Sequence, residues 1–573
     1  MPNFYKDNDD IQFHIKHLDI DRIIELKENH FQDKNTYDYA PVNVNDAKDS
    51  YEKILDIAGD IAGNFIAPRA AEVDAEGAHF ENGEVTYATG TKEELDVLKQ
   101  ADLMGFTLPR KYGGLNCPVT IYSIATEMVS RADASLMNLF GLQDIAETIN
   151  LFAEEEQKMR YLPRFCSGEV TGSMALTEPD AGSDLQAVQL KAYQDEKGQW
   201  RLKGVKRFIT NGCGHISLVL ARSEEGTSDG RGLSMFIYER DDKMKIRRIE
   251  NKLGIHGSPT CELQFNDAPA ELCGKRKMGL IKYVMSLMNG ARLAIAAQGL
   301  GIAEAAYAEA DQYAKDRVQF KKAIRDMIPV SELLVNMRVK IEAARALLYE
   351  TALIVDLKAC LEHESEKSDE TAKSLRDELK KTSAMAALFT PLVKGYNTEI
   401  GNQVAYDAIQ IHGGTGFMKE FNAERHYRDA RITNIYEGTT QLQVVAAIGG
   451  IVKGVAAEKL ADYDSKASFT GLEFLKKPLR QMKELTEKAI EYVRNKNDSL
   501  YQEYHSRRLV EMVTNTIIGY LMLRDAGRSE RKKDVAKYFI EMALPEVSTR
   551  HEIIVNNIQH FLEKKQEILD GKN

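Results

Sequence analysis

Apolar residues recur at three- and four-residue spacings in two large parts of the chain. In the first part the spacing is clear in "YEKILDIAGDIAGNFIAPRAAEVD" and "EELDVLKQADLMGF". It places the apolar side chains on one face of a helix. Residues 36–170 are therefore predicted to form a helical domain. The Gly- and Pro-containing stretch "LPRKYGGLNCP", Leu108 to Pro118, is predicted to be a loop between helices.

The pattern changes after this helical part. Short segments rich in β-branched and aromatic residues, such as "QWRLKGVKRFITNG", "HISLVLARS", "GLSMFIYERD" and "MKIRRIENKLG", are divided by Gly, Asp and Asn. This texture is typical of strands joined by turns, and "YQDEKGQW" predicts a hairpin loop. Residues 171–280 are therefore predicted to be a β domain inserted between helical parts.

The helical spacing returns at "YVMSLMNGARLAIAAQGLGIAEAAYAEADQYAKDR" and holds almost to the end of the sequence. Residues 281–450 are predicted to form a second helical domain. Beyond "AAIGGIVKG", the segments "LRQMKELTEKAIEYVR" and "RRLVEMVTNTIIGYLMLRDA" predict a further helical domain over residues 451–573. Residues 1–35 form an N-terminal extension. The predicted fold class is a multidomain α+β protein.

Composition and charge exclude some classes of function. Hydrophobic residues make up 43% and charged residues 28% of the chain, which is ordinary for a soluble globular protein. A net charge of −11 argues against general binding to nucleic acid or to an anionic membrane, although it permits a local basic pocket. No apolar run approaches the roughly 18 residues that span a bilayer, and no signal peptide is evident. A cytoplasmic location is expected.

The cysteines and histidines do not predict a metal site. The six cysteines are scattered without a CxxC pair, which fits reduced thiols better than disulfides or a zinc site. His256 and His412 lie in Gly-flanked loops, and nothing near them supplies metal-ligand spacing.

Two motifs near the start of the β domain offer groups that bind ligands. "MALTEPDAGSD" carries the hydroxyls of Thr177 and Ser183, and exposed N–H groups in such a turn can hold an anion. "RFITNG" is expected to put Phe208 and Thr210 on one face of a strand, because side chains alternate along a strand. A ring and a hydroxyl on one face suit a flat heteroaromatic group. On these residues alone, a decorated turn and a strand with one core residue stay open as alternatives.

Three further motifs lie in the second helical part. "DRVQF" and "QIHGGTGF" place Arg317 and the pair Gly413-Gly414 near helix ends, where they could contact phosphate or could be a surface residue and a helix stop. "NIYEGTTQLQ" carries Glu437 on a loop, because Gly and the Thr hydroxyls break a helix. A lone loop glutamate is usually just solvated. The sequence contains neither a Rossmann fingerprint nor a P-loop.

These motifs, together with "KLGIHGSPTCELQF" and "RDARITNIYEGTTQLQ", follow one order along the chain between Leu151 and Gln443. The ordered set closely resembles the acyl-CoA dehydrogenase family of FAD enzymes, over roughly residues 50–450. The resemblance implies an N-terminal helical domain, a central β-barrel-like domain and a C-terminal four-helix bundle. The N-terminal start and the extra helical domain resemble a larger bacterial branch that includes methylmercaptopropionyl-CoA dehydrogenases. An appended helical domain also occurs in the very-long-chain enzymes.

The resemblance gives Glu437 a role, because the acid of the family's Tyr-Glu-Gly-Thr motif is the catalytic base. It would take the α-proton of an acyl-CoA thioester while the β-hydrogen leaves as hydride to flavin N5, which yields the trans-2-enoyl thioester. The backbone N–H of this glutamate and a flavin ribityl hydroxyl would stabilise the thioester oxygen. Desolvation is expected to raise the pKa of Glu437. Some members place the base on a helix before an arginine; here that position is Ala291, before Arg292, so the alternative site is empty.

The resemblance also implies cofactor and substrate contacts. The residues expected to bind FAD within the subunit are Met174, Leu176, Thr177, Gly182, Ser183, Phe208, Ile209, Thr210, Thr439 and Gln441. The residues expected to bind the FAD of a neighbouring subunit are Arg317, Gln319, Phe320, Gln410, Gly413 and Gly414. The residues expected to bind substrate are Ser183, Asn289, Arg292 and Gly438. Lys321 departs from the family, which usually has Gly there, and this puts the local pyrophosphate contact in question.

The implied partners are an acyl-CoA substrate, an electron-transfer flavoprotein as acceptor and a second copy of the chain. A homodimer is preferred to the family's commoner tetramer, because the appended helices would cover the surface where two dimers meet. The implied pathway is fatty-acid β-oxidation or related acyl-CoA catabolism. Two alternatives stay open. An acyl-CoA oxidase shares the flavin and base but uses oxygen, and a non-catalytic DNA-associated relative would need a basic face that the nearly neutral appended domain lacks.

Overall fold

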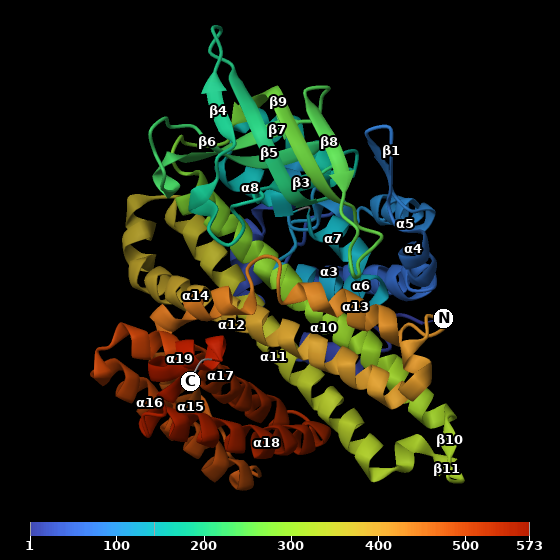
Figure 1. Cartoon of the computed structure of the whole chain (residues 1–573), viewed down its shortest axis with the longest axis vertical. Helices are drawn as coiled ribbons and strands as arrows, with labels where there is room; N and C mark the ends of the chain where they lie inside the picture. The colour runs from blue at the N-terminus through green and yellow to red at the C-terminus, as the bar shows by residue number, and fades with distance from the viewer. Residues whose placement is uncertain (1, 143, 572–573) are drawn as a thin grey trace.

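The computed structural model describes residues 2–142 and 144–571. The large sheet lies at one end of the molecule, long helices cross the middle, and the last helices form a layer at the other end (Figure 1). Along the chain the order is helices, strands, helices, as the hydrophobic pattern predicts. The predicted α+β class is confirmed.

The N-terminal part is helical apart from one short hairpin. Several helices begin behind a side-chain cap: Asn8 accepts hydrogen bonds from the N–H groups of Asp10 and Ile11, and Asn43 from that of Asp46. The elements are α1 (Asp9–His17), α2 (Asp21–Lys27), α3 (Val44–Asp60), a π-helical turn (Ile61–Ile66), α4 (Ala70–Glu76), β1 (His79–Glu81), β2 (Glu84–Thr86), α5 (Thr89–Gln100), α6 (Val119–Ala132), α7 (Ala134–Gly141), α8 (Asp144–Phe152) and α9 (Glu155–Cys166).

The strands that follow close into a barrel. They are β3 (Gly172–Ala175), β4 (Lys191–Gln194), β5 (Trp200–Thr210), β6 (Ile216–Arg222), β7 (Leu233–Glu239), β8 (Met244–Ile249) and β9 (Thr260–Leu272). Because β6 pairs with β7 as well as with β4, the order β6-β4-β5-β9-β7 returns to its start. β3 pairs with β6 as a parallel neighbour, and β8 pairs with β9 as an antiparallel neighbour. β4 and β5 form the hairpin predicted at "YQDEKGQW".

Three long helices form the centre of the second helical part. They are α10 (Met285–Asp316), α11 (Ile328–Ser365) and α12 (Asp369–His412); the short β10 (Val318–Gln319) and β11 (Lys322–Ala323) follow α10, and α13 (Ala423–Thr433) and α14 (Thr440–Val452) follow α12. A Cβ on Gly401 of α12 would stand 2.7 Å from the carbonyl oxygen of Gly299 in α10. A Cβ on Gly301 would stand 2.4 Å from the carbonyl oxygen of Glu127 in α6. The small residues therefore let α10 pack closely between α6 and α12.

The last part of the chain is a helical layer packed against the bundle. It comprises α15 (Val455–Lys466), α16 (Glu473–Lys496), α17 (Ser499–Ala526), α18 (Glu530–Val555) and α19 (His560–Asp570). α17 packs on α14 and α11, and α18 also contacts α11. None of the helices in the described ranges combines the length and the apolar character needed to cross a membrane. All six cysteines are unpaired thiols.

A buried arginine ties the N-terminal extension to the bundle. Arg345 of α11 is fully buried, and its guanidinium donates to the carboxylates of Asp10 in α1 at 2.5 Å, Glu127 in α6 at 2.6 Å and Glu304 in α10 at 2.7 Å. Three carboxylates around one guanidinium leave a surplus of negative charge.

A buried lysine from the last layer offsets that surplus. Lys532 of α18 is almost fully buried, and its ammonium contacts Asp10 and lies 2.6 Å from the carboxylate of Glu342. Removing one partner of a buried ion pair leaves an uncompensated charge away from water, which is strongly destabilising. The last helices therefore contribute to the stability of the bundle as well as covering it.

The substitution Lys532→Met is expected to lower the free energy of unfolding by about 1–3 kcal/mol, because Asp10 and Glu342 lose a buried hydrogen-bonded cation. The loss is not larger because Arg345 still pairs with Asp10, and Arg531 with Glu342. The matched control is Lys533→Met, one residue along, whose ammonium forms a partly exposed pair with Glu530 at 2.6 Å. The control is expected to cost less than about 1 kcal/mol. Chemical denaturation measures both, and equal effects of the two substitutions would contradict the assigned role.

Candidate active site

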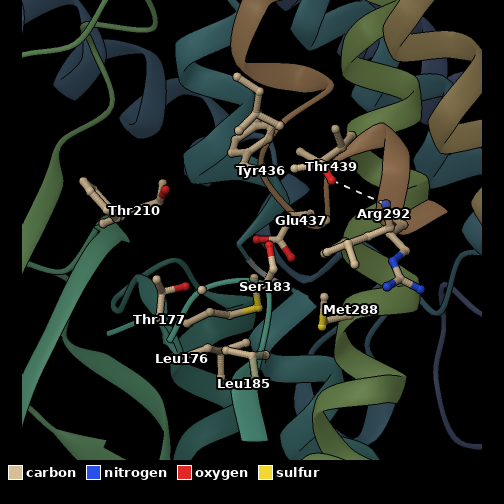
Figure 2. A pocket seen from close by; sticks show the side chains of 18 of the residues that line it. Leu176, Thr177, Ser183, Leu185, Thr210, Met288, Arg292, Tyr436, Glu437 and Thr439 are labelled. Atoms are coloured by element: carbon tan, nitrogen blue, oxygen red, sulfur yellow. Dashed lines mark hydrogen bonds between the residues drawn. The ribbon is translucent and has the colours of Figure 1, made fainter. Parts of the chain in front are cut away.

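A cleft of about 1260 Å³ lies where the barrel meets the helices. Its walls come from the loop after β3, the end of β5, the loops at 229–231 and 250–255, the first turns of α10 and the loop between α13 and α14. Figure 2 shows the carboxylate of Glu437 directed into this space, near the loop that carries Thr177 and Ser183. Segments far apart in the sequence thus meet around one carboxylate.

Glu437 stands on the loop between α13 and α14, as the sequence predicts. Its φ of 53° and that of Gly438, 91°, both lie in the left-handed region. This region is uncommon for a residue with a side chain, and such a residue costs of order 1–3 kcal/mol unless its surroundings hold it. The turn aims the side chain at the cleft instead of continuing a helix.

The protein around Glu437 changes its acidity. The side chain is only partly accessible and lines the cleft, and desolvation raises the pKa of its carboxyl. The nearby charges of Lys394 and Arg292 act in the opposite direction and lower it, by a smaller amount. The interpretation of Glu437 as a solvated loop residue is therefore not supported.

Arg292 lies beside this carboxylate on α10. It is buried, it donates to Asn289 Oδ1 at 3.2 Å, and its Nε has no hydrogen-bond partner among the described residues. Burial lowers the pKa of Arg292, and the charge of Glu437 opposes that shift. Ala291, the alternative base position that the family resemblance implied, also lines the cleft.

Hydroxyl groups occupy the opposite wall. Thr177, Ser183 and Thr210 all line the cleft. Among the described residues, none of these three hydroxyls is engaged in a side-chain hydrogen bond, so they are available to a ligand. Hydroxyl groups that can donate and accept hydrogen bonds, set among apolar side chains, suit a flat cofactor with polar edges. FAD fits this set of groups.

A buried ion pair supports that wall from behind. Lys206 of β5 is fully buried and donates to Leu176 O at 2.8 Å and Glu178 Oε1 at 2.9 Å. The Glu178 carboxylate also accepts from the N–H groups of Gln189 and Leu190, at 2.8 and 2.9 Å. These contacts fix the path of the "MALTEPDAGSD" loop.

The end of β5 departs from regular alternation. The ladder with β9 shifts register between Lys206 and Ile209, and Phe208 has a φ of 60°. Both Phe208 and Thr210 reach the cleft, but regular alternation is not the reason. A β-bulge re-aims side chains in this way.

Most of the residues predicted from the sequence to hold cofactor or substrate line this cleft: Met174, Leu176, Thr177, Gly182, Ser183, Phe208, Ile209, Thr210, Arg292, Glu437, Gly438 and Thr439. Two predicted residues, Asn289 on α10 and Gln441 on α14, are exposed and do not line the cleft.

A second group of predicted residues gathers at the far end of α10 and α12. It comprises Arg317, Gln319, Phe320, Gln410, Gly413 and Gly414. The two helix ends are joined there, since Thr415 donates to the Tyr313 hydroxyl at 3.0 Å and Tyr313 stacks on His412 at 4.4 Å. Figure 1 places this end, marked by β10 and β11, well away from the barrel. These residues do not meet the cleft of their own chain.

Two features of the site were not predicted from the sequence. Lys394, buried in α12, reaches the Glu437 loop, and its only signal is a lysine among apolar positions in "FTPLVKGYN". Tyr436 donates to Gln298 and, at 3.1 Å, to Asn138 Oδ1, forming a polar network on the helical side of the cleft. No short motif marks this network, since its members lie far apart in the chain.

Histidines and acids form no metal site in the described part of the chain. The His256 ring lies 3.0 Å from Asp74, which raises the pKa of His256, and 2.9 Å from Lys252 O. His412 contacts Ala408 O at 2.7 Å.

Comparison with known protein families finds matches along nearly the whole chain. The N-terminal domain of acyl-CoA dehydrogenases matches residues 48–169, their middle domain residues 173–268 and their C-terminal domain residues 281–448. A further domain, described as acyl-CoA dehydrogenase C terminal, matches residues 452–561.

Individual relatives agree with these matches. The chain is 34% identical over 441 residues to 3-methylmercaptopropionyl-CoA dehydrogenase of Ruegeria pomeroyi, covering 72% of this chain and 71% of the relative. It is 33% identical over 415 residues to a short-chain specific acyl-CoA dehydrogenase of Megasphaera elsdenii, covering 71% of this chain and 98% of the relative. A Bacillus anthracis acyl-CoA dehydrogenase complexed with FAD shares the fold, with a TM-score of 0.77 and 24% identity over 89% of this chain and 88% of that one. The chain belongs to the acyl-CoA dehydrogenase family and is an oxidoreductase of that family.

Proposed function

We propose that this protein is an FAD-dependent dehydrogenase that oxidises the Cα–Cβ bond of an acyl-CoA thioester to the trans-2-enoyl-CoA. The observation that supports this most directly is the placement of Glu437. One carboxylate with a raised pKa faces a wall of available hydroxyls across a cleft. Proton abstraction next to a thioester needs such a base held against the substrate.

Glu437 would act as the base that removes the α-proton. A raised pKa improves its match to a weakly acidic carbon acid near neutral pH. With alanine at position 291, the helix offers no second carboxylate at the place some relatives use. The backbone N–H of Glu437 would donate to the thioester oxygen as negative charge develops there.

The opposite wall would hold the cofactor. The hydroxyls of Thr177, Ser183 and Thr210 and the Phe208 ring would contact FAD. The Lys206–Glu178 pair holds the loop that carries Thr177 and Ser183 in place. FAD, when bound, would supply the acceptor for the β-hydrogen and its two electrons. An electron-transfer flavoprotein is the proposed partner that removes those electrons, in fatty-acid β-oxidation or related acyl-CoA catabolism.

The helical side of the cleft suits an acyl chain. Its lining there is mainly apolar, from Met137, Leu142, Ile145, Met288 and Ile295. Apolar walls with a few polar groups are the usual form of a small-molecule site.

We also propose a homodimer in which the second residue group contacts the cofactor of the neighbouring subunit. Phe320 and Phe417 are 90% and 77% exposed at that end of the bundle. Aromatic side chains so exposed are often covered by a partner. Arg317 and Gln410 would then complete the partner's cofactor site.

Glu437→Gln is expected to fold, to take up FAD and to bind acyl-CoA, while its rate of flavin reduction falls by ~10²–10⁴ because the basic carboxylate is gone. Adding Ala291→Glu to this variant is expected to restore part of the rate, because position 291 on α10 also lines the cleft. Anaerobic stopped-flow absorbance measures the step. A near-normal rate in Glu437→Gln would show that another group takes the proton.

Phe417→Asp is expected to weaken the dimer and to lower the fraction of protein that retains FAD, because a charge would enter the proposed interface. The control is Leu569→Asp, which changes a residue of similar exposure (74%) on α19. Light scattering and the ratio of flavin to protein absorbance give the two readouts. A fully flavinylated monomer of the unaltered protein would refute the cross-subunit role.

A further inference from the structure

A lysine is buried directly beneath the Glu437 loop. Lys394 lies in the middle of α12, its side chain is inaccessible to solvent, and its Nζ donates to the carbonyl oxygen of Gly438 at 2.7 Å. An ammonium group so far from water normally has a carboxylate hydrogen-bonded to it. Here the hydrogen-bond partner is the peptide that follows the proposed base.

That peptide already has a neutral donor. Gln443 of α14 donates through Nε2 to Gly438 O at 2.8 Å and to Glu437 O at 3.3 Å. Lys394 and Gln443 therefore both donate to the backbone of the turn at Glu437 and Gly438. These consecutive residues have positive φ angles of 53° and 91°. Gln443 alone would satisfy the carbonyl, so burying a charge there for a second hydrogen bond calls for another explanation.

The charge of Lys394 also acts on Glu437 through space. The groups whose charges act on Lys394 are Glu437 on the loop, Arg292 on α10 and Glu399 on its own helix. Those that act on Glu437 are Lys394 and Arg292, and Lys394 has the larger effect. Glu399 is engaged elsewhere, because its Oε1 accepts from the Thr440 hydroxyl at 2.6 Å.

We propose that Lys394 is a positioning residue for Glu437: it holds the left-handed turn through the Gly438 carbonyl, and its positive charge favours the ionised carboxylate. This inference rests on the proposed role of Glu437 as base. Without a cation beneath it, desolvation would keep the carboxyl protonated up to a higher pH, and a protonated acid cannot abstract a proton. Because burial lowers the pKa of Lys394 to about 7, its charge acts on the carboxylate at and below neutral pH.

Three variants separate charge from hydrogen bonding. Lys394→Met removes both the charge and the donor, Lys394→Arg keeps both, and Gln443→Met removes the neutral donor to the same carbonyl. The measurement is the pH dependence of anaerobic flavin reduction. Lys394→Met is expected to move the midpoint of the rise in rate to higher pH by about one unit or more. At a pH below the midpoint, each unit of this shift lowers the rate of Lys394→Met roughly tenfold relative to the unaltered protein. The reason is that the ionised fraction of the base falls roughly tenfold per pH unit.

The other two variants decide the outcome. Lys394→Arg is expected to restore the midpoint of the unaltered protein, and Gln443→Met is expected to leave the midpoint in place even if the rate falls. An unchanged midpoint in Lys394→Met, or an equal shift in Gln443→Met, would overturn the proposal. If Lys394→Met does not fold, Lys394→Gln takes its place and is judged by the same midpoint.

Thermal unfolding gives a readout independent of activity. Burial lowers the pKa of Lys394 to about 7, whereas an unfolded lysine titrates near 10.4. Between these values the unfolded chain binds one more proton, so the stability contributed at this position rises with pH. The unaltered protein is therefore expected to gain stability relative to Lys394→Met from pH 7 to 10. A constant difference would contradict the placement of this lysine. If the unaltered protein reduced no flavin with any acyl-CoA, the proposed function would fail while this comparison still tested Lys394.

Discussion

The structure depends on the way charges are paired inside it, above all around Arg345. Its guanidinium holds carboxylates from three helices, and Lys532 adds a second cation from the last layer. Each of these charges would be costly in isolation, since desolvation of an ion exceeds what a single weak contact returns. Their mutual pairing fixes how α1, α6, α10, α11 and α18 sit against one another. The N-terminal extension and the appended helices are thus structural parts of the bundle.

Burial of charge also governs the cleft, but there the buried carboxylate is not closed into an ion pair. Glu437 is enclosed by protein, but the structure gives it no hydrogen-bonded cation; Lys394 bonds to the adjacent peptide, and Arg292 to Asn289. Both cations influence the carboxylate through space. An acid held in this way keeps a raised pKa and stays open to a substrate. The carboxylate of Glu127, in contrast, is closed off by the hydrogen bonds that it accepts from Arg345 and Tyr349. The close contact of α10 with α12 at Gly299 and Gly401 brings the two cations to the same loop.

Much of this could be predicted from the sequence, for identifiable reasons. The hydrophobic period gives the order of helices and strands, and Gly-Thr-Thr after Glu437 predicts its loop. The grouping of Thr177, Ser183 and Thr210 follows from the family motifs, not from spacing. The bulge at Phe208 could not be predicted, because a bulky residue at positive φ depends on the strand beside it. Nor could Lys394, since a lysine in a helix is usually solvated, or the Arg345 cluster, whose members come from opposite ends of the chain.

The central claim is that this cleft oxidises an acyl-CoA thioester with Glu437 as base. The most direct measurement is an anaerobic titration of the FAD-loaded, unaltered protein with a panel of acyl-CoAs of different length and branching, followed by flavin absorbance. The account predicts bleaching of the oxidised flavin by at least one of them, with the matching 2-enoyl-CoA as product. A protein that binds FAD and acyl-CoA but shows no bleaching with any member of the panel would contradict it.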